Sequence, residues 1–439
     1  MKPMPGEMTP LQTLNPLSPD QNLTPETFDA TQFLGLAPFL RMSIAGDECT
    51  ALAQELITRA QQNPDDAVLW MNLSTVMLCL QRTELGLTIQ NQALAMQQVY
   101  TLKAAHPPAK LRLLMLMVPG TLSANVPLDC LLENSDIELI YYYITPEAPF
   151  DAPIPEHDVL MIGISATTEN LFLLQQLASV TRQWPVPVIN APQHIPNSER
   201  HIASRVLQNQ PGLTIAQAYP VTLATLSAVV AGQITLNDAL PDSDFPVILR
   251  PAGSHGGHGL ERVTSQAELA SYLTRVQVEE YFLSKFIDYS NEDGQFRKYR
   301  ISLIDGVPYA CHMAISSHWM VHYVNAFMYE DPKKREEEAA FLTGFSEFAA
   351  RHRDALKAIF DITQLDYLGI DCSETPEGTL LVFEIDPAMV IHAMDLEVMF
   401  PHKQIHMNKV KTACRDLLLS RAFAHANASA DVLKGQELV

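Results

Sequence analysis

The most informative stretch of the chain is FPVILRPAGSHGGHGL, residues 245–260. It opens as a short apolar run that ends in a cation, Arg250, which indicates a strand that delivers a charged side chain. Glycine lets the backbone of the following loop approach a polyphosphate closely and turn its N–H groups toward it. No GK[ST] sequence closes the loop, so it is not a Walker A motif, and a flexible hairpin turn is the alternative. The loop holds four of the 18 glycines, namely Gly253, Gly256, Gly257 and Gly259.

Two further apolar runs carry charged residues. Residues 278–288, VEEYFLSKFID, indicate a strand with polar residues near its end. Residues 296–304, FRKYRISLI, run into Asp305-Gly306, a hairpin signal. Lys298 and Arg300 lie two apart in this strand, so their side chains share one face. On a solvated face they would be ordinary surface residues, whereas in a phosphate-binding cleft they would neutralise negative charge.

Three acids interrupt the apolar runs 368–371 (LGID) and 380–387 (LLVFEIDP). Asp371 ends the first run, and Glu384 and Asp386 lie two apart in the second, on one face of a strand. Carboxylates inside apolar strands are costly unless positive charge meets them. Mg²⁺ bound by carboxylates and phosphate oxygens is the usual solution. Buried salt bridges to Arg or Lys are the alternative.

Upstream, residues 108–215 alternate apolar strands with helices. A helix is expected over 169–183, and apolar strands joined by helices indicate a parallel sheet covered on both faces. No GxGxxG follows the first strand, so a dinucleotide-binding domain has no support. The expected strands cover residues 111–118, 137–144, 159–164 and 186–190.

Together these stretches resemble the ATP-grasp superfamily over residues 216–425. The segment 108–215 resembles the domain that precedes the grasp, and residues 190–192 and 197–200 are similar to its asparagine segment, which crosses into the grasp domain. The nearest pattern is that of the glutamate-adding and D-alanine–D-alanine ligases. The resemblance implies an α/β and α+β multidomain fold, with an N-terminal helical region, a small parallel α/β domain and an ATP-grasp domain.

The resemblance also implies an ATP and Mg²⁺ site. Arg250 stands where a lysine usually holds the α- and β-phosphates, and Ser254 with Gly256, Gly257 and Gly259 would cover the phosphates. The segment whose backbone contacts the adenine edge corresponds to Ser284, Lys285, Phe286 and Ile287, with Asp288 near the ribose. The set that holds two Mg²⁺ ions corresponds to Asp371, Glu384 and Asp386.

The implied catalytic residues are Arg300, Lys298 and His392. Arg300 matches the arginine commonly placed by the reacting phosphate, and His392 falls where family members place substrate-contacting loop residues. Lys298 stands where related ligases often have Asp. Asp386 replaces the usual Asn, and the added charge should strengthen metal binding. Arg250 keeps the charge of the usual Lys but changes its shape.

Residues 316–325, SSHWMVHYVN, are rich in groups able to contact a substrate. We expect His318, His322 and Asn325 to line the acceptor pocket. The two histidines are four apart, a spacing that on a helix also suits zinc, but no acid of the HExxH kind lies between them. Ordinary partly buried histidines are the alternative.

The N-terminal part of the chain differs in pattern from the rest. Residues 1–28 contain six prolines and are expected to be a flexible leader. Residues 29–107 show helical periodicity without strand signals, and residues 426–439 are expected to be a tail. One unit of the helical region resembles a tetratricopeptide repeat, a plain helical bundle being the alternative. The residues that carry this likeness are Trp70, Leu73, Met77, Gly86 and Ala93.

Composition limits the partners. The 439 residues hold 29 Lys and Arg against 50 Asp and Glu, a net charge of -21, which disfavours nucleic acid and anionic membranes. Six scattered cysteines without a CxxC pair suggest buried free thiols in a reducing compartment. With neither a signal-peptide pattern nor a membrane-length apolar run, a soluble cytoplasmic protein is expected. We also expect a homo-oligomer.

The chemistry implied by the resemblance is ligation. ATP would activate a carboxylate as an acyl phosphate, and an amine would then attack it and release ADP and phosphate. The substrates would be a small-molecule or peptide carboxylate and an amine, and the helical region would bind a peptide, a protein or a second subunit. The alternatives are an ATP-grasp phosphotransferase and a nucleotide-binding scaffold that recruits a partner through the helical region.

Overall fold

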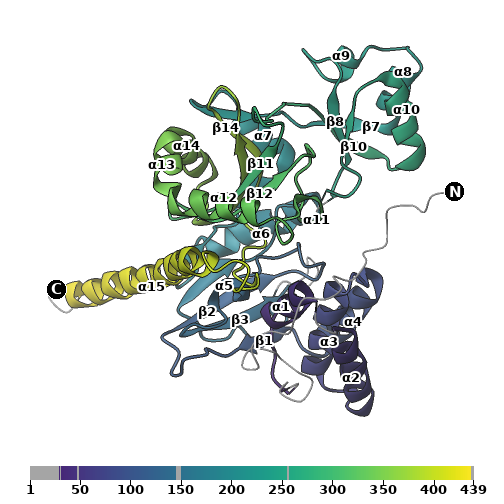
Figure 1. Cartoon of the computed structure of the whole chain (residues 1–439). Helices are drawn as coiled ribbons and strands as arrows, with labels where there is room; N and C mark the ends of the chain where they lie inside the picture. Colours follow the sequence, from purple (N-terminus) through teal and green to yellow (C-terminus); the bar gives the residue numbers. More distant parts are fainter. Residues whose placement is uncertain (1–28, 30, 47–48, 145–149, 255–256, 437–439) are drawn as a thin grey trace.

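The computed structural model describes residues 29, 31–46, 49–144, 150–254 and 257–436 (Figure 1). The expected leader, residues 1–28, lies outside this described part. The described residues form a mixed α/β structure with a five-stranded, a four-stranded and a second five-stranded sheet. No helix among them combines the length and the hydropathy needed to span a bilayer. All six cysteines are buried and free, as their scatter in the sequence predicted.

The described residues of the helical region form four helices, in a part of the chain whose periodicity predicted helices. Asp66 caps α3 by accepting hydrogen bonds from Val68 N and Leu69 N. α3 and α4 pack closely, because Ser74 Oγ donates to Gly86 O at 2.8 Å and a Cβ on Gly86 would lie 2.8 Å from Leu78 Cδ2. The likeness to a tetratricopeptide repeat stays a prediction. The helices are α1 (Ala37–Ala45), α2 (Cys49–Gln62), α3 (Ala67–Cys79) and α4 (Thr83–Met96).

The first sheet has the order β1-β3-β2-β4-β5. All its strands except β1 pair in parallel with their neighbours among these four, as their apolar runs predicted. They are β2 (Leu111–Met117), β3 (Ile137–Tyr143), β4 (Val159–Ile162) and β5 (Val188–Ile189). The edge strand β1 (Val99–Leu102) pairs antiparallel with β3 and lies where the sequence indicated no strand. Four residues are too few for a periodic signal, so pairing with β3 fixes this strand. Helices α5 (Asp129–Leu132) and α6 (Leu171–Thr181) complete the unit.

The second sheet, of order β7-β10-β8-β9, belongs to a separate lobe at the upper right of Figure 1. All its neighbouring strands are antiparallel. Its core is apolar and includes the fully buried rings of Tyr272 and Tyr281. The elements of the lobe are β7 (Tyr219–Thr222), α8 (Leu223–Val230), α9 (Leu236–Ala239), β8 (Val247–Pro251), β9 (Glu261–Val263), α10 (Gln266–Arg275) and β10 (Glu280–Lys285).

The third sheet has the order β12-β11-β13-β14-β6. Its edge strand β6 (Leu213–Ile215) pairs parallel with β14, although the sequence placed it in the preceding domain, so the two units share a sheet. The other strands are β11 (Phe296–Ile304), β12 (Val307–Ser316), β13 (Tyr367–Glu374) and β14 (Leu380–Asp386), and the helices are α11 (Tyr323–Ala326), α12 (Pro332–Thr343), α13 (Phe345–Arg351) and α14 (Arg353–Thr363).

The long helix α15 (Lys403–Gln436) joins the first and third sheets. Arg415 on α15 forms a bidentate ion pair with Asp136, at 2.6 and 2.7 Å. The helix continues through most of the expected tail, and its end projects from the body (Figure 1). Its buried apolar side chains, among those that the structure describes, are Met407, Val410, Cys414, Leu417 and Leu418.

Candidate active site

A cavity of about 400 Å³ lies between the second and third sheets and reaches the loops of the first sheet. Strands β8 and β10 line it from one lobe, and β11, β13 and β14 from the other. The loop after β4 and the start of α7 (Arg200–Val206) close a further end. Elements from residues 165 to 386 therefore meet at one site.

A row of charged side chains crosses three neighbouring strands at this cavity. Arg300 on β11 is the register partner of Asp371 on β13, which is the register partner of Glu384 on β14. Arg300 Nε and Nη2 donate to the two Asp371 oxygens at 2.8 and 2.9 Å. Lys298 Nζ lies 2.6 Å from Asp371 Oδ2. The two predicted catalytic cations thus hold the first predicted metal ligand.

Asp371 is nearly inaccessible to solvent, with 3% of its surface exposed. Burial opposes its ionisation, but Arg300 and Lys298 outweigh burial and hold the pKa of Asp371 well below its usual range. The alternative of a buried salt bridge, which the sequence left open, therefore describes Asp371 in this conformation.

Arg200, at the first turn of α7, is a site residue that sequence reasoning missed. Its Nη2 donates to Glu384 Oε1 at 2.6 Å, and its Nη1 donates to Phe383 O at 3.4 Å. The segment 197–200 resembled a family feature, but nothing in it indicated a charge partner almost 200 residues away. Only the contact of α7 with β14 brings this arginine to the acid row.

Asp386 is the acid of the set for which no ion pair occurs among the described residues. Burial and the neighbouring Glu384 raise the pKa of Asp386 to about 7. Its Oδ1 accepts a hydrogen bond from Ala388 N at 2.8 Å. Asp386 is therefore the acid most in need of a further positive charge.

Arg250 ends β8 as a buried cation, with 7% of its surface exposed. Its Nε donates to Ser254 Oγ at 3.2 Å, and its Nη2 donates to Ser254 O. Among the described residues it forms no ion pair. Burial, followed by the like charge of Arg200, lowers the pKa of Arg250 to about 10. A buried guanidinium without a counter-charge is costly, so this end of the cavity is suited to an anion.

The glycine loop divides into cavity-lining and structural positions. Gly253 and Gly257 line the cavity and have φ of 71° and 77°, a backbone region that favours glycine. Gly259 is not among the lining residues. A Cβ there would meet Pro251 Cδ at 2.8 Å, and its carbonyl accepts from Tyr272 Oη, so Gly259 allows close packing in this structure. Gly256 lies outside the described residues.

The end of β10 and the residues that follow it form another wall of the cavity. The cavity is lined here by Ser284, Lys285, Phe286 and Ile287. Trp319, which the sequence did not single out, also lines the cavity and contacts the Phe286 ring edge to face, with centroids 5.8 Å apart. Asp288 is not among the lining residues; its Oδ1 accepts from Ser290 N at 2.9 Å and shapes a turn.

Of the three predicted pocket residues, His322 lines the cavity. Burial, and then Lys298 and Arg300, lower the pKa of His322, which keeps the imidazole neutral at pH 7. Asn325 is not among the lining residues: its side chain accepts from His322 N at 3.0 Å and donates to Met320 O at 2.7 Å, closing a turn. His318 is likewise outside the lining, beside Met320 on the same turn.

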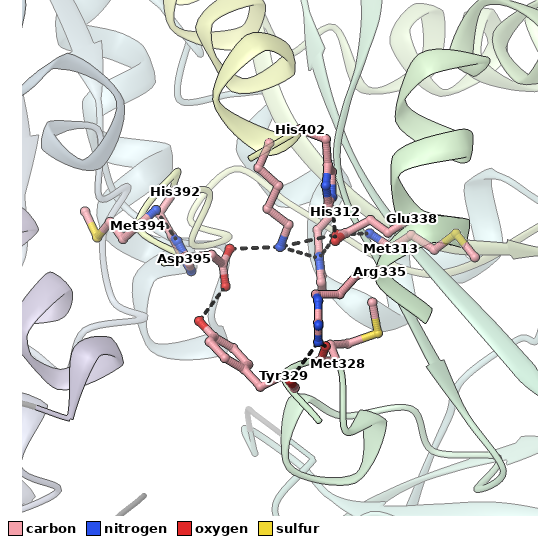
Figure 2. Close-up of polar contacts among 11 residues, drawn as sticks. His312, Met313, Met328, Tyr329, Arg335, Glu338, His392, Met394, Asp395 and His402 are labelled. Atoms are coloured by element: carbon pink, nitrogen blue, oxygen red, sulfur yellow. Dashed lines mark hydrogen bonds and ion pairs between the residues drawn. The ribbon is translucent and has the colours of Figure 1, made fainter. Parts of the chain in front are cut away.

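His392, predicted as catalytic, is not among the residues that line the cavity. Its Nδ1 accepts a hydrogen bond from Met394 N at 3.2 Å, as Figure 2 shows. Burial lowers the pKa of His392 to about 4. A neutral histidine engaged in a backbone contact supports the segment after β14 rather than touching the reacting groups.

The buried carboxylate of Glu338 anchors the same segment (Figure 2). Glu338 lies 2.6 Å from His312 Nδ1 and 3.2 Å from both His402 Nε2 and Lys403 Nζ. Lys403 continues to Asp395 Oδ2 at 2.8 Å. Glu338 ends a run of charged residues, 330–338, whose composition is typical of a solvated helix start or a mobile lid, but the acid is buried and points inward from α12.

This network reaches the active site through the backbone. The segment from residue 387 to 402 follows β14, and Arg300 Nη1 donates to Val390 O within it at 2.8 Å. Asp395 fixes the far half of the segment to Lys403 and to Tyr329 Oη, the latter at 3.1 Å. The Glu338 network therefore stabilises the surface against which Arg300 is oriented.

The acids do not gather into a ready metal site in this conformation. Within the described part of the chain, no group of three or more His, Cys, Asp or Glu residues is placed to hold a metal ion. Asp371 and Glu384 are instead paired with cations, and the zinc arrangement of His318 and His322 does not form. The predicted metal ligands share one wall of the cavity without forming a cluster.

Comparison with known proteins gives only distant likenesses. No family model and no curated protein matches the chain. A D-alanine-D-alanine ligase from Coxiella burnetii has 11% identity and a TM-score of 0.44, covering 75% of this chain and 100% of that chain. D-alanyl-alanine synthetase A from Vibrio cholerae O1 biovar eltor has 13% identity and a TM-score of 0.45, covering 72% and 99%.

A RimK domain protein, ATP-grasp, from Sphaerobacter thermophilus has 16% identity and a TM-score of 0.38, covering 70% of this chain and 99% of that chain. At such identities and TM-scores, these likenesses assign neither a family nor an activity to this chain.

We predict that Glu338→Gln lowers the free energy of unfolding by about 3 kcal/mol, because it leaves Lys403 buried with less counter-charge. Urea denaturation measures the change. Asp361→Asn is the matched control, since it breaks the exposed pair with Lys357 and should cost less than about 0.5 kcal/mol. Equal effects of the two variants would contradict the role of the buried network.

We predict that Asp386→Asn stabilises the metal-free protein by about 4 kcal/mol at pH 8 and has no effect near pH 4. The folded carboxyl keeps its proton up to about pH 7, whereas the unfolded one loses it near pH 4, so ionisation of Asp386 reduces stability as the pH rises between them. Asn retains the acceptor for Ala388 N. Urea denaturation in EDTA at both pH values measures this, and an equal effect at both would contradict it.

Proposed function

We propose that this chain is an ATP- and Mg²⁺-dependent ligase of the ATP-grasp type that joins a carboxylate to an amine. The observation that carries the proposal is the buried guanidinium of Arg250, which has no ion pair among the described residues and lines the same cavity as the Arg300–Asp371–Glu384 row. A cation beneath a glycine-rich loop suits a polyphosphate.

The charges of the cavity suit the transfer of a phosphoryl group. Arg250 and Gly253 would hold the polyphosphate on the lobe of the second sheet, and Arg300 would face it from the third. Phosphoryl transfer needs little covalent help from a protein, because positioning and charge compensation supply most of the catalysis. The proposed reaction therefore requires no nucleophilic side chain.

The acid row fits Mg²⁺ by its donor chemistry. Carboxylate oxygens are the hard ligands that Mg²⁺ prefers. Burial and Glu384 raise the pKa of Asp386, and a bound divalent cation would lower it again by stabilising the carboxylate. Glu384, with 35% of its side chain exposed, and Asp386 would hold the ion, whereas both oxygens of Asp371 are paired with Lys298 and Arg300 in this conformation. The ion would neutralise charge on the transferred phosphoryl group.

The reaction would proceed in two steps. A carboxylate oxygen attacks the γ-phosphorus of ATP, which forms an acyl phosphate and releases ADP. The amine nitrogen then attacks the acyl carbon, which forms the amide and releases phosphate. His322, neutral at pH 7 and in the cavity wall, would contact the acceptor and take up the proton that the amine loses. Phe286 and Trp319 would shield the adenine end of the nucleotide from water.

We predict that ATP binds in the presence of Mg²⁺ and that Glu384→Ala weakens this binding at least about tenfold, because a carboxylate at the triphosphate is lost. Titration calorimetry with and without EDTA measures it. Glu377→Ala is the control, since Glu377 is an exposed acid in the turn before β14. No ATP binding to the native chain would contradict the proposal.

Product analysis then separates the ligase from a phosphotransferase. Hydroxylamine added during turnover should trap an acyl hydroxamate, and free phosphate should appear together with ADP. A stable phosphorylated product without free phosphate would instead identify a phosphotransferase.

A further inference from the structure

Ser165 has a buried hydroxyl that the fold does not use. It follows β4, is 2% exposed and lines the cavity. Its Oγ has no hydrogen-bond partner among the described residues, a condition shared there only with Ser302 Oγ. Leaving such a group unpaired costs free energy. Ser302 lies inside β11 and is absent from the cavity lining, whereas Ser165 is one of the residues that line the cavity.

The surroundings of Ser165 are typical of a ligand-binding edge. β4 and β5 are adjacent parallel strands, and ligands of open α/β sheets bind beyond the carboxyl ends of such strands. Beyond β4, Thr167 and Thr168 line the cavity where a short 3₁₀ turn leads into α6. The first N–H groups of a helix point toward whatever lies before it, and this favours negative charge.

Beyond β5, Ser198 and Arg200 also line the cavity, but both are engaged: Ser198 Oγ donates to Ile195 O at 2.8 Å, and Arg200 pairs with Glu384 at 2.6 Å. Glu199, the other acid there, caps α7 by accepting from two backbone N–H groups. The donors that remain are the Ser165 hydroxyl and the first N–H groups of the helix after β4, while the carboxylates that an ammonium group would need are occupied.

We propose that this end of the cavity is the subsite for the carboxylate group of the substrate, with Ser165 Oγ as a hydrogen-bond donor to it. The inference deepens the proposed ligase function, on which it rests for the identity of the second ligand. It separates two anion positions in one cavity: the polyphosphate at Arg250 and the carboxylate at the edge of the first sheet.

A reporter thiol at the exposed Thr168 tests the subsite without nucleotide. In T168C, alkylation by iodoacetamide is followed by mass spectrometry with increasing acetate, the small carboxylate used as probe, and with chloride at equal ionic strength. All six native cysteines are buried, so the native chain gives the background. We expect acetate, and not chloride, to slow the alkylation.

The two orphaned serines supply the matched variants. In the T168C background, S165A should raise the acetate concentration for half-protection about tenfold, the expected loss for one hydrogen bond to a charged group. S302A should leave it unchanged. Both variants remove an unpaired hydroxyl, so neither should lower the melting temperature, and this separates a binding effect from damage to the fold.

Three outcomes would overturn the subsite: no protection by acetate, equal protection by chloride, or an S165A effect no larger than that of S302A. Protection by inorganic phosphate at lower concentration than acetate would also overturn it, assigning this end to the polyphosphate. Because no ATP is present, failure here leaves the calorimetric test of ATP binding untouched, and failure of that test leaves this one interpretable.

Discussion

The clamp of Lys298 and Arg300 on the Asp371 carboxylate is the interaction on which the rest of the site depends. The carboxylate is buried at the centre of the third sheet, where an unpaired charge would be too costly to keep. Lys298 and Arg300 on β11 pair with Asp371. The neighbouring acid on β14, Glu384, pairs instead with Arg200, which comes from a different unit of the chain. Charge compensation thus couples the first and third sheets.

The same requirement explains how an acidic protein can present a cationic cavity. The chain carries a net charge of -21, yet the cavity collects cations from three units. A cleft of local positive charge raises the concentration of anions near it even when the rest of the surface repels them. The cavity-lining cations are Arg200, Arg250, Lys285, Lys298 and Arg300.

Sequence patterns predicted the parts of the molecule that local physics governs. The parallel strands of the first sheet were found because each is a continuous apolar run. Arg250 and Arg300 were singled out because a charged side chain within an apolar strand is costly unless an opposite charge compensates it. β1 was missed because Thr101 interrupts its short apolar run, and β6 was placed in the preceding unit because its partner lies more than 160 residues away.

Other errors came from contacts that only the folded chain makes. Glu338 stood in a charge run typical of a solvated helix, and three partners from distant segments turned it into a buried anchor. Arg200 and Ser165 gave no signal, since one is defined by its acid on β14 and the other by a hydroxyl left unpaired in a cavity. His392 follows β14, but it accepts a hydrogen bond from Met394 N and is not among the residues that line the cavity.

Hydrogen exchange with and without ATP and Mg²⁺ tests most directly whether the cavity between the second and third sheets holds a metal–polyphosphate. The account predicts that ATP with Mg²⁺ slows exchange both in peptides covering 247–260 and in those covering 380–390, and that EDTA abolishes the protection of the second set. Protection confined to one lobe, or unchanged exchange in both, would contradict it.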